Sequence, residues 1–330
     1  MTRLTLSIAM GDYDRTRPIH DGRAPIDGVE PVTMLLSPEE MFFRAFRHQP
    51  FDVSELSLSS YCVKLAQGDC PYVGIPVFLS RAFRHSSIYI RTDRGIEAPQ
   101  DLRGKRIGLA EWQLTANVWV RGILEGYGVA PSEIDWVRGG MHKPGRPEKI
   151  PVALPDDITL SPAPEGATLD EMLRAGEIDG YIGPRSLRCF DEGHPKVRRL
   201  FSDGVAAASE HYRRTGIFPI MHLLGIRRDL ADCHPWLAGA LFKSFERARS
   251  MACEALSDTS ATKVTMPFVE DILETGRTLA GGAELWTYGV PGNEMVLETF
   301  LDLHHRQGLS PRRLSLGELF HPSAYESFSL

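Results

Sequence analysis

Two stretches near the middle of this chain each place a short apolar strand pattern directly before a loop. The first runs from Asp101 to Leu109 and the second from Gly176 to Arg185. A segment with helical spacing of apolar residues, Thr115 to Tyr127, follows the first stretch. Ligands of open α/β sheets bind beyond the carboxyl ends of the strands. The two stretches therefore predict a two-lobed α/β protein that binds small anions.

Hydrophobic periodicity and capping residues predict the other elements in the same way. Strands are expected over residues 4–10, 51–56, 72–79, 87–91, 107–109, 134–137, 178–182 and 217–226. Helices are expected to begin at Ser37, Ser57, Thr115, Thr168 and Pro235, and the last helix is expected over 293–307. Strands alternate with helices in both halves of the chain, which is typical of α/β proteins.

The length of 330 residues exceeds what one hydrophobic core usually holds, so two domains are expected. The order of elements assigns residues 1–91 and 217–330 to a discontinuous lobe I, and residues 92–216 to lobe II. Two crossing strands near residues 91 and 217 are expected to form a hinge. The ligand is expected in a central cleft between the lobes.

Charge and cysteine content exclude several classes of partner. The formal net charge is −6, whereas nucleic acids and anionic membranes select a basic surface, so neither is expected as a partner. No apolar run reaches the length of about 18 residues that spans a bilayer. The five cysteines form no Cys-x-x-Cys pair and no secretory signal pattern is present, so reduced thiols in the cytoplasm are expected. Self-association into a homo-oligomer is left open by the sequence.

Both central stretches resemble the type II periplasmic-binding-protein fold, the first its second-lobe opening and the second its second-lobe closing strand. A more specific resemblance, to the 4,5-dihydroxyphthalate decarboxylase family, extends over nearly the whole chain. It is carried by five segments: Leu6 to Pro18, Glu55 to Tyr61, Phe78 to His85, Tyr212 to His222 and Leu256 to Lys263. The resemblance implies a soluble bacterial enzyme that converts a dihydroxylated phthalate to protocatechuate and carbon dioxide without an organic cofactor.

Two other functions share the expected fold. A solute-binding or sensor protein for an aromatic carboxylate would bind without turnover, and a related enzyme would act on another hydroxylated aromatic acid. The chain has no Gly-x-Gly-x-x-Gly or Walker loop, no Gly-x-Ser-x-Gly elbow and no His-x-x-x-His pair. A hydroxyl para to the carboxylate lets the substrate hold the electrons of the breaking bond itself. We therefore expect neither a cofactor nor a metal.

Decarboxylation of such a substrate requires cations for two carboxylates, a group that polarises a phenol, and an acid that protonates the ring. Arg81, Arg84 and His85 lie in one short loop between predicted strands, so the two arginines are candidate carboxylate ligands. The alternative interpretation is that this loop is a solvent-exposed basic turn with no role in binding. Arg185 follows the strand at 178–182 and is either a carboxylate clamp from lobe II or a surface ion-pair partner.

The ring-protonating acid has two candidates, His85 and His222, because imidazole titrates near neutral pH. A histidine within an apolar strand, such as His222, is more often a core residue whose ring nitrogens are hydrogen-bonded within the protein. Asp12 and Glu55 are candidate phenol bases or hydrogen-bond acceptors. Tyr13 follows the first strand and is expected either to stack on the substrate ring or to pack within lobe I.

The remaining substrate-binding candidates lie at predicted helix starts and strand ends. Ser59, Ser60 and Thr115 are expected as helix caps whose neighbouring N–H groups also bind an anion. Trp112 follows the strand at 107–109 and is assigned to the same site. Together these residues predict a cytoplasmic, cofactor-independent decarboxylase that binds an aromatic dicarboxylate.

Overall fold

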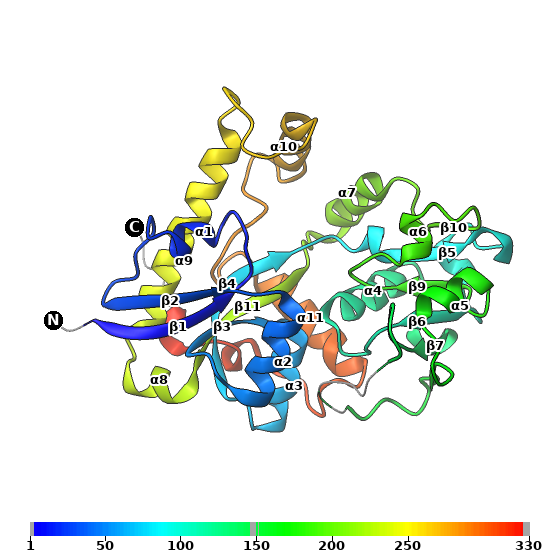
Figure 1. The fold of residues 1–330 in the computed structure, drawn as a ribbon, viewed down its shortest axis with the longest axis horizontal. Coiled ribbons are helices and arrows are strands. Elements are labelled where there is room, and N and C mark those ends of the chain that lie inside the picture. Colours follow the sequence, from blue (N-terminus) through cyan, green and yellow to red (C-terminus); the bar gives the residue numbers. More distant parts are fainter. Residues whose placement is uncertain (1–2, 146–149, 151, 326–330) are drawn as a thin grey trace. The chain divides into compact units, whose positions relative to one another are not determined.

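The computed structural model describes residues 3–145, 150 and 152–325, and its chain divides into two compact units (Figure 1). Unit 1 contains the described residues of Met1–Arg81, Ile220–Glu298 and Leu314–Leu330. Unit 2 contains those of Ala82–Pro219 and Thr299–Arg313. The chain therefore crosses between the units at residues 81–82, 219–220, 298–299 and 313–314.

Unit 1 is built on a five-stranded mixed sheet with the order β2-β1-β3-β11-β4. Its strands are β1 (Leu4–Met10), β2 (Val29–Leu35), β3 (Val53–Ser57), β4 (Tyr72–Arg81) and β11 (Ile220–Arg227). Its helices are α1 (Arg17–His20), α2 (Pro38–His48), α3 (Leu58–Gln67), α8 (Arg228–Cys233), α9 (Leu237–Ser257) and α10 (Val269–Leu279). β1 runs parallel to β2 and β3, whereas β11 runs antiparallel to both β3 and β4. The central strand of this sheet is thus β3, with β1 and β11 on its two sides.

The sequence of β3 is unusual for a central strand because three of its five residues are polar. All five of its residues are buried, including Ser54 and Glu55, which are 0% exposed. The strand ends at Ser57, whose side chain caps α3 by accepting a hydrogen bond from the Ser60 N–H at 3.5 Å. The predicted helix start is confirmed, but Ser59 and Ser60, which were predicted as caps, lie within the first turn of the helix instead. A buried polar side chain requires hydrogen-bond partners, so Glu55 in particular must be satisfied by neighbouring elements.

Unit 2 is built on a six-stranded sheet with the order β10-β5-β9-β6-β7-β8. Its strands are β5 (Ile88–Arg91), β6 (Arg106–Leu109), β7 (Asp135–Arg138), β8 (Leu160–Pro162), β9 (Gly180–Ile182) and β10 (Val197–Arg199). Its helices are α4 (Thr115–Gly126), α5 (Leu169–Ala175), α6 (Arg188–Asp191) and α7 (Gly204–Thr215), and α11 (Glu294–Arg306) starts in unit 1 and ends here. β6 runs parallel to β7 and β9, and β7 runs parallel to β8, whereas β5 is antiparallel to both β9 and β10.

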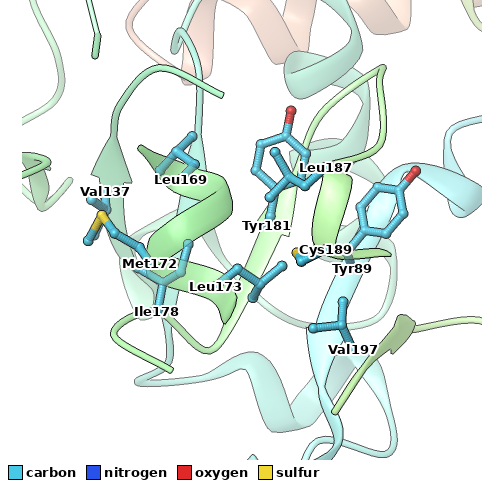
Figure 2. Close-up of a cluster of buried hydrophobic side chains, with 10 residues drawn as sticks. All are labelled: Tyr89, Val137, Leu169, Met172, Leu173, Ile178, Tyr181, Leu187, Cys189 and Val197. Carbon is cyan, nitrogen blue, oxygen red and sulfur yellow. The ribbon is translucent and has the colours of Figure 1, made fainter. Parts of the chain in front are cut away.

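Part of the core of unit 2 lies between α5 and the sheet, where ten buried side chains form one cluster (Figure 2). Leu169, Met172 and Leu173 project from α5, and their contacts include Tyr181 of β9. α5 begins at a capping box, since the Thr168 hydroxyl oxygen accepts from the Glu171 N–H at 3.2 Å. The helix start predicted at Thr168 is confirmed.

The boundaries of the units differ from the predicted lobes in three places, the shortest being residues 217–219, which were assigned to lobe I but belong to unit 2. Residues 82–91 were assigned to lobe I but belong to unit 2, because β5 pairs with β9 and β10 of its sheet. Residues 299–313 also belong to unit 2, because the Phe300 ring contacts that of Trp119 on α4, with the ring centroids 5.4 Å apart. These corrections come from pairing and packing between segments far apart in the sequence.

None of the helices in the described part of the chain is long and apolar enough to cross a membrane.

Candidate active site

The buried carboxylate of Glu55 is the centre of a hydrogen-bonded cluster in unit 1. Its Oε2 accepts from the Gly11 N–H at 2.9 Å, and its Oε1 accepts from the Tyr13 hydroxyl at 3.2 Å. His222 Nδ1 lies 2.6 Å from the same Oε1. These three contacts satisfy the carboxyl group, as its complete burial requires. Glu55 therefore joins the loop after β1 to a histidine of β11.

The pairing of β3 with β11 brings Glu55 and His222 together. Leu224 lies opposite Glu55 in this antiparallel pair, and His222 lies opposite Ser57. Residues two apart along a strand share one face of the sheet, so His222 is the diagonal neighbour of Glu55 on that face. The contact joins residues that are 167 positions apart in the sequence.

The loop after β1 positions Tyr13 directly over Gly11. A Cβ atom added at Gly11 would lie 2.2 Å from Tyr13 Cζ, so any larger residue would force the Tyr13 ring to move. The Thr16 hydroxyl closes the loop by donating to the Gly11 carbonyl at 2.6 Å and accepting from the Tyr13 N–H at 3.0 Å. Burial, followed by the nearby Glu55 charge, raises the pKa of Tyr13 far above its usual range. Tyr13 is therefore held as a neutral phenol that donates to Glu55.

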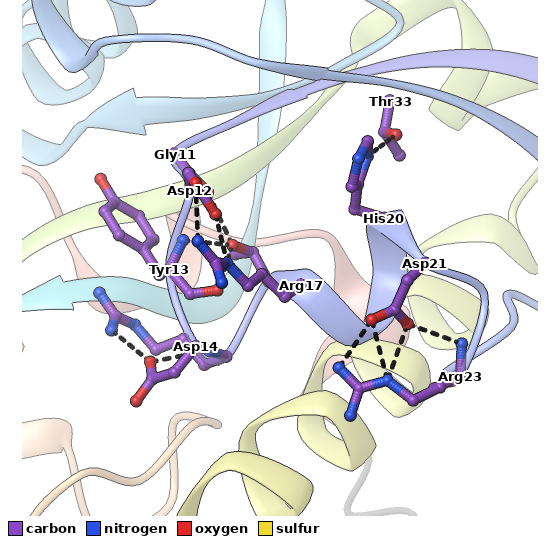
Figure 3. Close-up of polar contacts among 11 residues, drawn as sticks. Gly11, Asp12, Tyr13, Asp14, Arg17, His20, Asp21, Arg23 and Thr33 are labelled. Carbon is purple, nitrogen blue, oxygen red and sulfur yellow. Dashed lines mark hydrogen bonds and ion pairs between the residues drawn. The ribbon is translucent and has the colours of Figure 1, made fainter. Parts of the chain in front are cut away.

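Asp12 lies outside the Glu55 cluster. Its carboxylate forms an ion pair with Arg17, with Nε 2.7 Å from Oδ1, and both side chains are about half exposed or more. The hydrogen bond from Arg17 lowers the pKa of Asp12. In Figure 3, the Asp12 carboxylate faces Arg17, while the Tyr13 ring points to the opposite side of the loop. The loop thus directs two neighbouring side chains to different environments.

Arg15, in the same loop, lies between two aromatic rings. Its guanidinium carbon is 4.3 Å from the ring centroid of Tyr13 and 4.3 Å from that of Trp286. Nε donates to the Leu79 carbonyl at 2.8 Å, and Nη1 donates to Asp14 at 3.1 Å. Only 17% of the side chain is exposed. Arg15 is therefore a largely desolvated cation beside Tyr13.

His222 is partly exposed to solvent, unlike the Glu55 carboxylate that it contacts. Its side chain is 16% exposed, whereas that of Glu55 is 0% exposed. The ring packs edge-on against Phe42, with the ring centroids 4.8 Å apart. Nδ1 is engaged by Glu55, and Nε2 makes no hydrogen bond to any described residue. The histidine therefore has one nitrogen fixed by a carboxylate and one available to a small molecule.

Ser59, Ser60 and Arg81 also lie in unit 1, where all three are buried. Both serines occupy the first turn of α3. Arg81 Nη1 donates to the Thr287 carbonyl at 3.2 Å and to Asn293 Oδ1 at 2.9 Å. These two contacts attach the end of β4 to the segment that follows Trp286. The structure thus shows Arg81 supporting this segment.

His85 and Arg84 lie in unit 2. His85 is 0% exposed and packs against His211 and Phe201, at ring-centroid distances of 5.2 and 5.3 Å. Neither nitrogen of either histidine ring has a hydrogen-bond partner among the described residues. Burial, with a contribution from the charge of Arg214, lowers the pKa of both histidines to about 4. Burial also lowers the pKa of Arg84 to about 10.

The other predicted residues of unit 2 have separate surroundings. Trp112 is 0% exposed, donates from Nε1 to the Gln307 carbonyl at 3.1 Å and lies under the Arg121 guanidinium. Thr115 was predicted as the cap of α4, but Leu114 occupies that position and Thr115 is the first helical residue. Arg185 is exposed, three residues beyond the end of β9. The sequence-predicted residues that the structure brings into direct contact are therefore Glu55, Tyr13 and His222.

Comparisons with known proteins agree with this fold and extend it to a family. A family model described as NMT1/THI5 like matches residues 73–146. Over its full length the chain is 58% identical to 4,5-dihydroxyphthalate decarboxylase from Comamonas testosteroni, with 100% of both chains covered. The chain belongs to the 4,5-dihydroxyphthalate decarboxylase family.

Solved structures show how the fold of this decarboxylase family is used elsewhere. The periplasmic aliphatic sulphonate binding protein SsuA from Escherichia coli matches with a TM-score of 0.56 and 12% identity, covering 98% of this chain and 99% of the other. The desulfurization enzyme DSZB matches with a TM-score of 0.53 and 11% identity, covering 98% of each chain. The predicted type II periplasmic-binding-protein fold is thus confirmed, and it occurs in both a binding protein and an enzyme.

Sequence reasoning missed several residues around the Glu55 cluster of this family member. Gly11, Arg15, Thr16 and Trp286 were not identified as site residues. Glycine directly after a strand, followed by a tyrosine, was the available signal for the loop. No signal near Trp286 shows that its ring meets Arg15, because 271 positions separate the two residues in the sequence.

Proposed function

We propose that this chain removes one carboxylate from 4,5-dihydroxyphthalate, giving protocatechuate and carbon dioxide. The observation that carries the proposal is the contact of 2.6 Å between the buried Glu55 carboxylate and His222 Nδ1. Membership of the family supplies the substrate class, because a relative with 58% identity bears this activity in its name. The cluster supplies the acid that the reaction requires.

The reaction replaces a ring carboxylate by a proton. In the substrate, each carboxylate lies para to one hydroxyl group, whose oxygen donates electron density to the carbon that bears the carboxylate. A proton added to that carbon forms the new C–H bond. The bond to the carboxylate then breaks, its electron pair restores the aromatic ring, and carbon dioxide leaves. One proton is consumed, and no external electron acceptor is needed.

His222 is the proposed proton donor. A protonated imidazole carries the proton on Nε2, while its Nδ1–H remains bonded to Glu55. The carboxylate fixes the orientation of the ring and stabilises its positive charge, as in other carboxylate–histidine pairs. Since His85 is fully buried, His222 is favoured over it as the acid.

Tyr13 and Gly11 position the pair. Both donate to Glu55, which keeps the carboxylate oriented towards His222. The neutral Tyr13 phenol adds no second negative charge beside Glu55, because its pKa is raised by burial and by that carboxylate. We assign Tyr13 a positioning role and a contact surface for the substrate ring.

The test compares His222→Gln with His48→Gln, an exposed histidine on α2 of the same unit. We expect His222→Gln to lower kcat by at least about a hundredfold with a smaller change in KM, since general acid catalysis contributes that much. His48→Gln should keep the wild-type kcat. A wild-type kcat in His222→Gln would overturn the assignment of the acid.

The same assay distinguishes the alternative functions. Protein that has been treated with a chelator is mixed with 4,5-dihydroxyphthalate, and carbon dioxide release and ultraviolet absorbance are followed. Binding without conversion would favour a sensor or an enzyme that requires a metal. Absence of both binding and conversion would direct the search to other hydroxylated aromatic acids.

Several further assignments stay predictions of the same proposal. Arg81, Arg84 and Arg185 are candidate carboxylate ligands, and Ser59, Ser60, Trp112 and Thr115 are candidate contacts. All five cysteines are free thiols, which is typical of a reducing compartment and supports the cytoplasm as the location. Cell fractionation tests the location, and sedimentation tests the homo-oligomer.

A further inference from the structure

The guanidinium of Arg15 differs from the other cations around the Glu55 cluster in how it is held. Two aromatic rings, a backbone carbonyl and one carboxylate contact it, and its side chain is only 17% exposed. Nε and Nη1 make the hydrogen bonds, and Nη2 makes none to the described residues. A planar guanidinium on an aromatic face is pre-organised, so it loses little freedom when it binds a carboxylate.

The position of Arg15 relates it to the proposed proton donor. The guanidinium lies over the ring of Tyr13, and the hydroxyl at the end of that ring contacts Glu55, which holds His222. The Arg15 cation and the Glu55 carboxylate therefore contact the same tyrosine, one at its ring face and the other at its hydroxyl. In 4,5-dihydroxyphthalate the retained carboxylate lies ortho to the ring carbon that is protonated, so a cation and an acid that contact the same tyrosine suit these two neighbouring positions.

We infer that Arg15 binds the carboxylate of the substrate that is retained in the product. This inference rests on the proposed decarboxylase function and identifies a residue that determines its substrate specificity. A cation on the departing carboxylate would stabilise a charge that disappears as carbon dioxide forms, which would raise the reaction barrier. A cation on the neighbouring carboxylate stabilises the substrate, the transition state and the product alike.

The neighbouring Arg17 provides a matched control. It lies two residues further along the same loop and carries the same charge, but its side chain is 62% exposed and pairs with Asp12. Among the described residues, no aromatic ring lies against its guanidinium. A substitution at Arg17 therefore changes the net charge of the loop without removing the desolvated cation.

The experiment measures KM for 4,5-dihydroxyphthalate and the inhibition constant of protocatechuate in wild type, Arg15→Gln and Arg17→Gln. In Arg15→Gln we expect both constants to rise by a similar factor of at least about ten, with kcat changed by much less. In Arg17→Gln both should stay within about twofold of wild type. A rise in KM without a rise in the inhibition constant would overturn the inference, because it would place Arg15 on the departing carboxylate. Unchanged values for both constants would overturn it as well.

Calorimetric binding of phthalate separates this inference from the proposed function. Phthalate has both carboxylates but no hydroxyl groups, so its binding is measured without turnover. If wild type does not decarboxylate 4,5-dihydroxyphthalate, the proposed function fails, whatever the Arg15 variant binds. If wild type turns over while Arg15→Gln binds phthalate and substrate normally, the inference alone fails. If Arg15→Gln does not fold, Arg15→Lys is measured in the same assays, because lysine keeps the charge but lacks the planar guanidinium. Values of KM and of the inhibition constant equal to those of wild type in Arg15→Lys would overturn the inference.

Discussion

The buried pair of His85 and His211 predicts that unit 2 loses stability below neutral pH. Burial lowers the pKa of both histidines to about 4, from an ordinary value of 6.5. Between these two values the unfolded chain binds protons that the folded chain does not bind. The free energy of unfolding therefore rises with pH across this window. The contribution is fully present above pH 6.5 and is lost as the pH falls towards 4.

The size of this effect follows from the two pKa values. Lowering the pH from 7.5 to 5.5 should reduce the free energy of unfolding by about 1.3 kcal/mol for one such histidine and about 2.7 kcal/mol for both. The exposed fractions of His85 and His211 are 0% and 8%, so solvent screening reduces these figures little. The charge of Arg214 lowers both pKa values, which adds to the penalty for protonating the pair.

Urea unfolding at pH 7.5 and 5.5, followed by circular dichroism, measures this difference. The double variant His85→Phe, His211→Phe removes both titrating groups but keeps aromatic rings beside Phe201. When the pH is lowered from 7.5 to 5.5, the decrease in the free energy of unfolding should be smaller in this variant than in wild type, by about 2.7 kcal/mol. His142→Gln, an exposed control in unit 2, should behave as wild type. An equal pH dependence in the double variant and wild type would refute the reasoning.

Two other substitutions test the positions of individual side chains. Gly11→Ala should lower kcat by at least about tenfold. The new Cβ would lie 2.2 Å from Tyr13 Cζ, so it displaces the Tyr13 ring and disturbs the Glu55 cluster. A wild-type kcat in this variant would contradict the positioning role of Tyr13. Trp112→Phe removes the hydrogen bond to the Gln307 carbonyl, so the free energy of unfolding should fall by about 1 kcal/mol. A raised KM with unchanged stability would instead support the substrate-binding role predicted for Trp112 from sequence.

Local sequence signals predicted many elements but not their long-range contacts. The strand expected over 4–10 is β1 with the same bounds, and the last helix expected over 293–307 covers Glu294–Arg306. Thr168 caps α5 as predicted, whereas the cap predicted at Thr115 is wrong by one position. Patterns of apolar residues locate a helix well, but they define its first residue less well.

The contacts of the site depend on features that local patterns do not contain. Glu55 and His222 were each identified as polar residues in apolar strands, but their contact depends on the register between β3 and β11. His85 was expected in a basic loop, and packing against Phe201 and His211 buries it completely. Burial of this kind is decided by residues more than a hundred positions away in the sequence.

The central claim is that the Glu55–His222 pair supplies the proton that replaces the lost carboxylate. It is tested most directly by the rate of carbon dioxide release from 4,5-dihydroxyphthalate in Glu55→Gln compared with wild type. The amide keeps the shape of the side chain but does not stabilise a protonated His222, so we predict a kcat lower by at least about a hundredfold. A kcat within a factor of about two of wild type, in a variant that folds normally, would contradict the account.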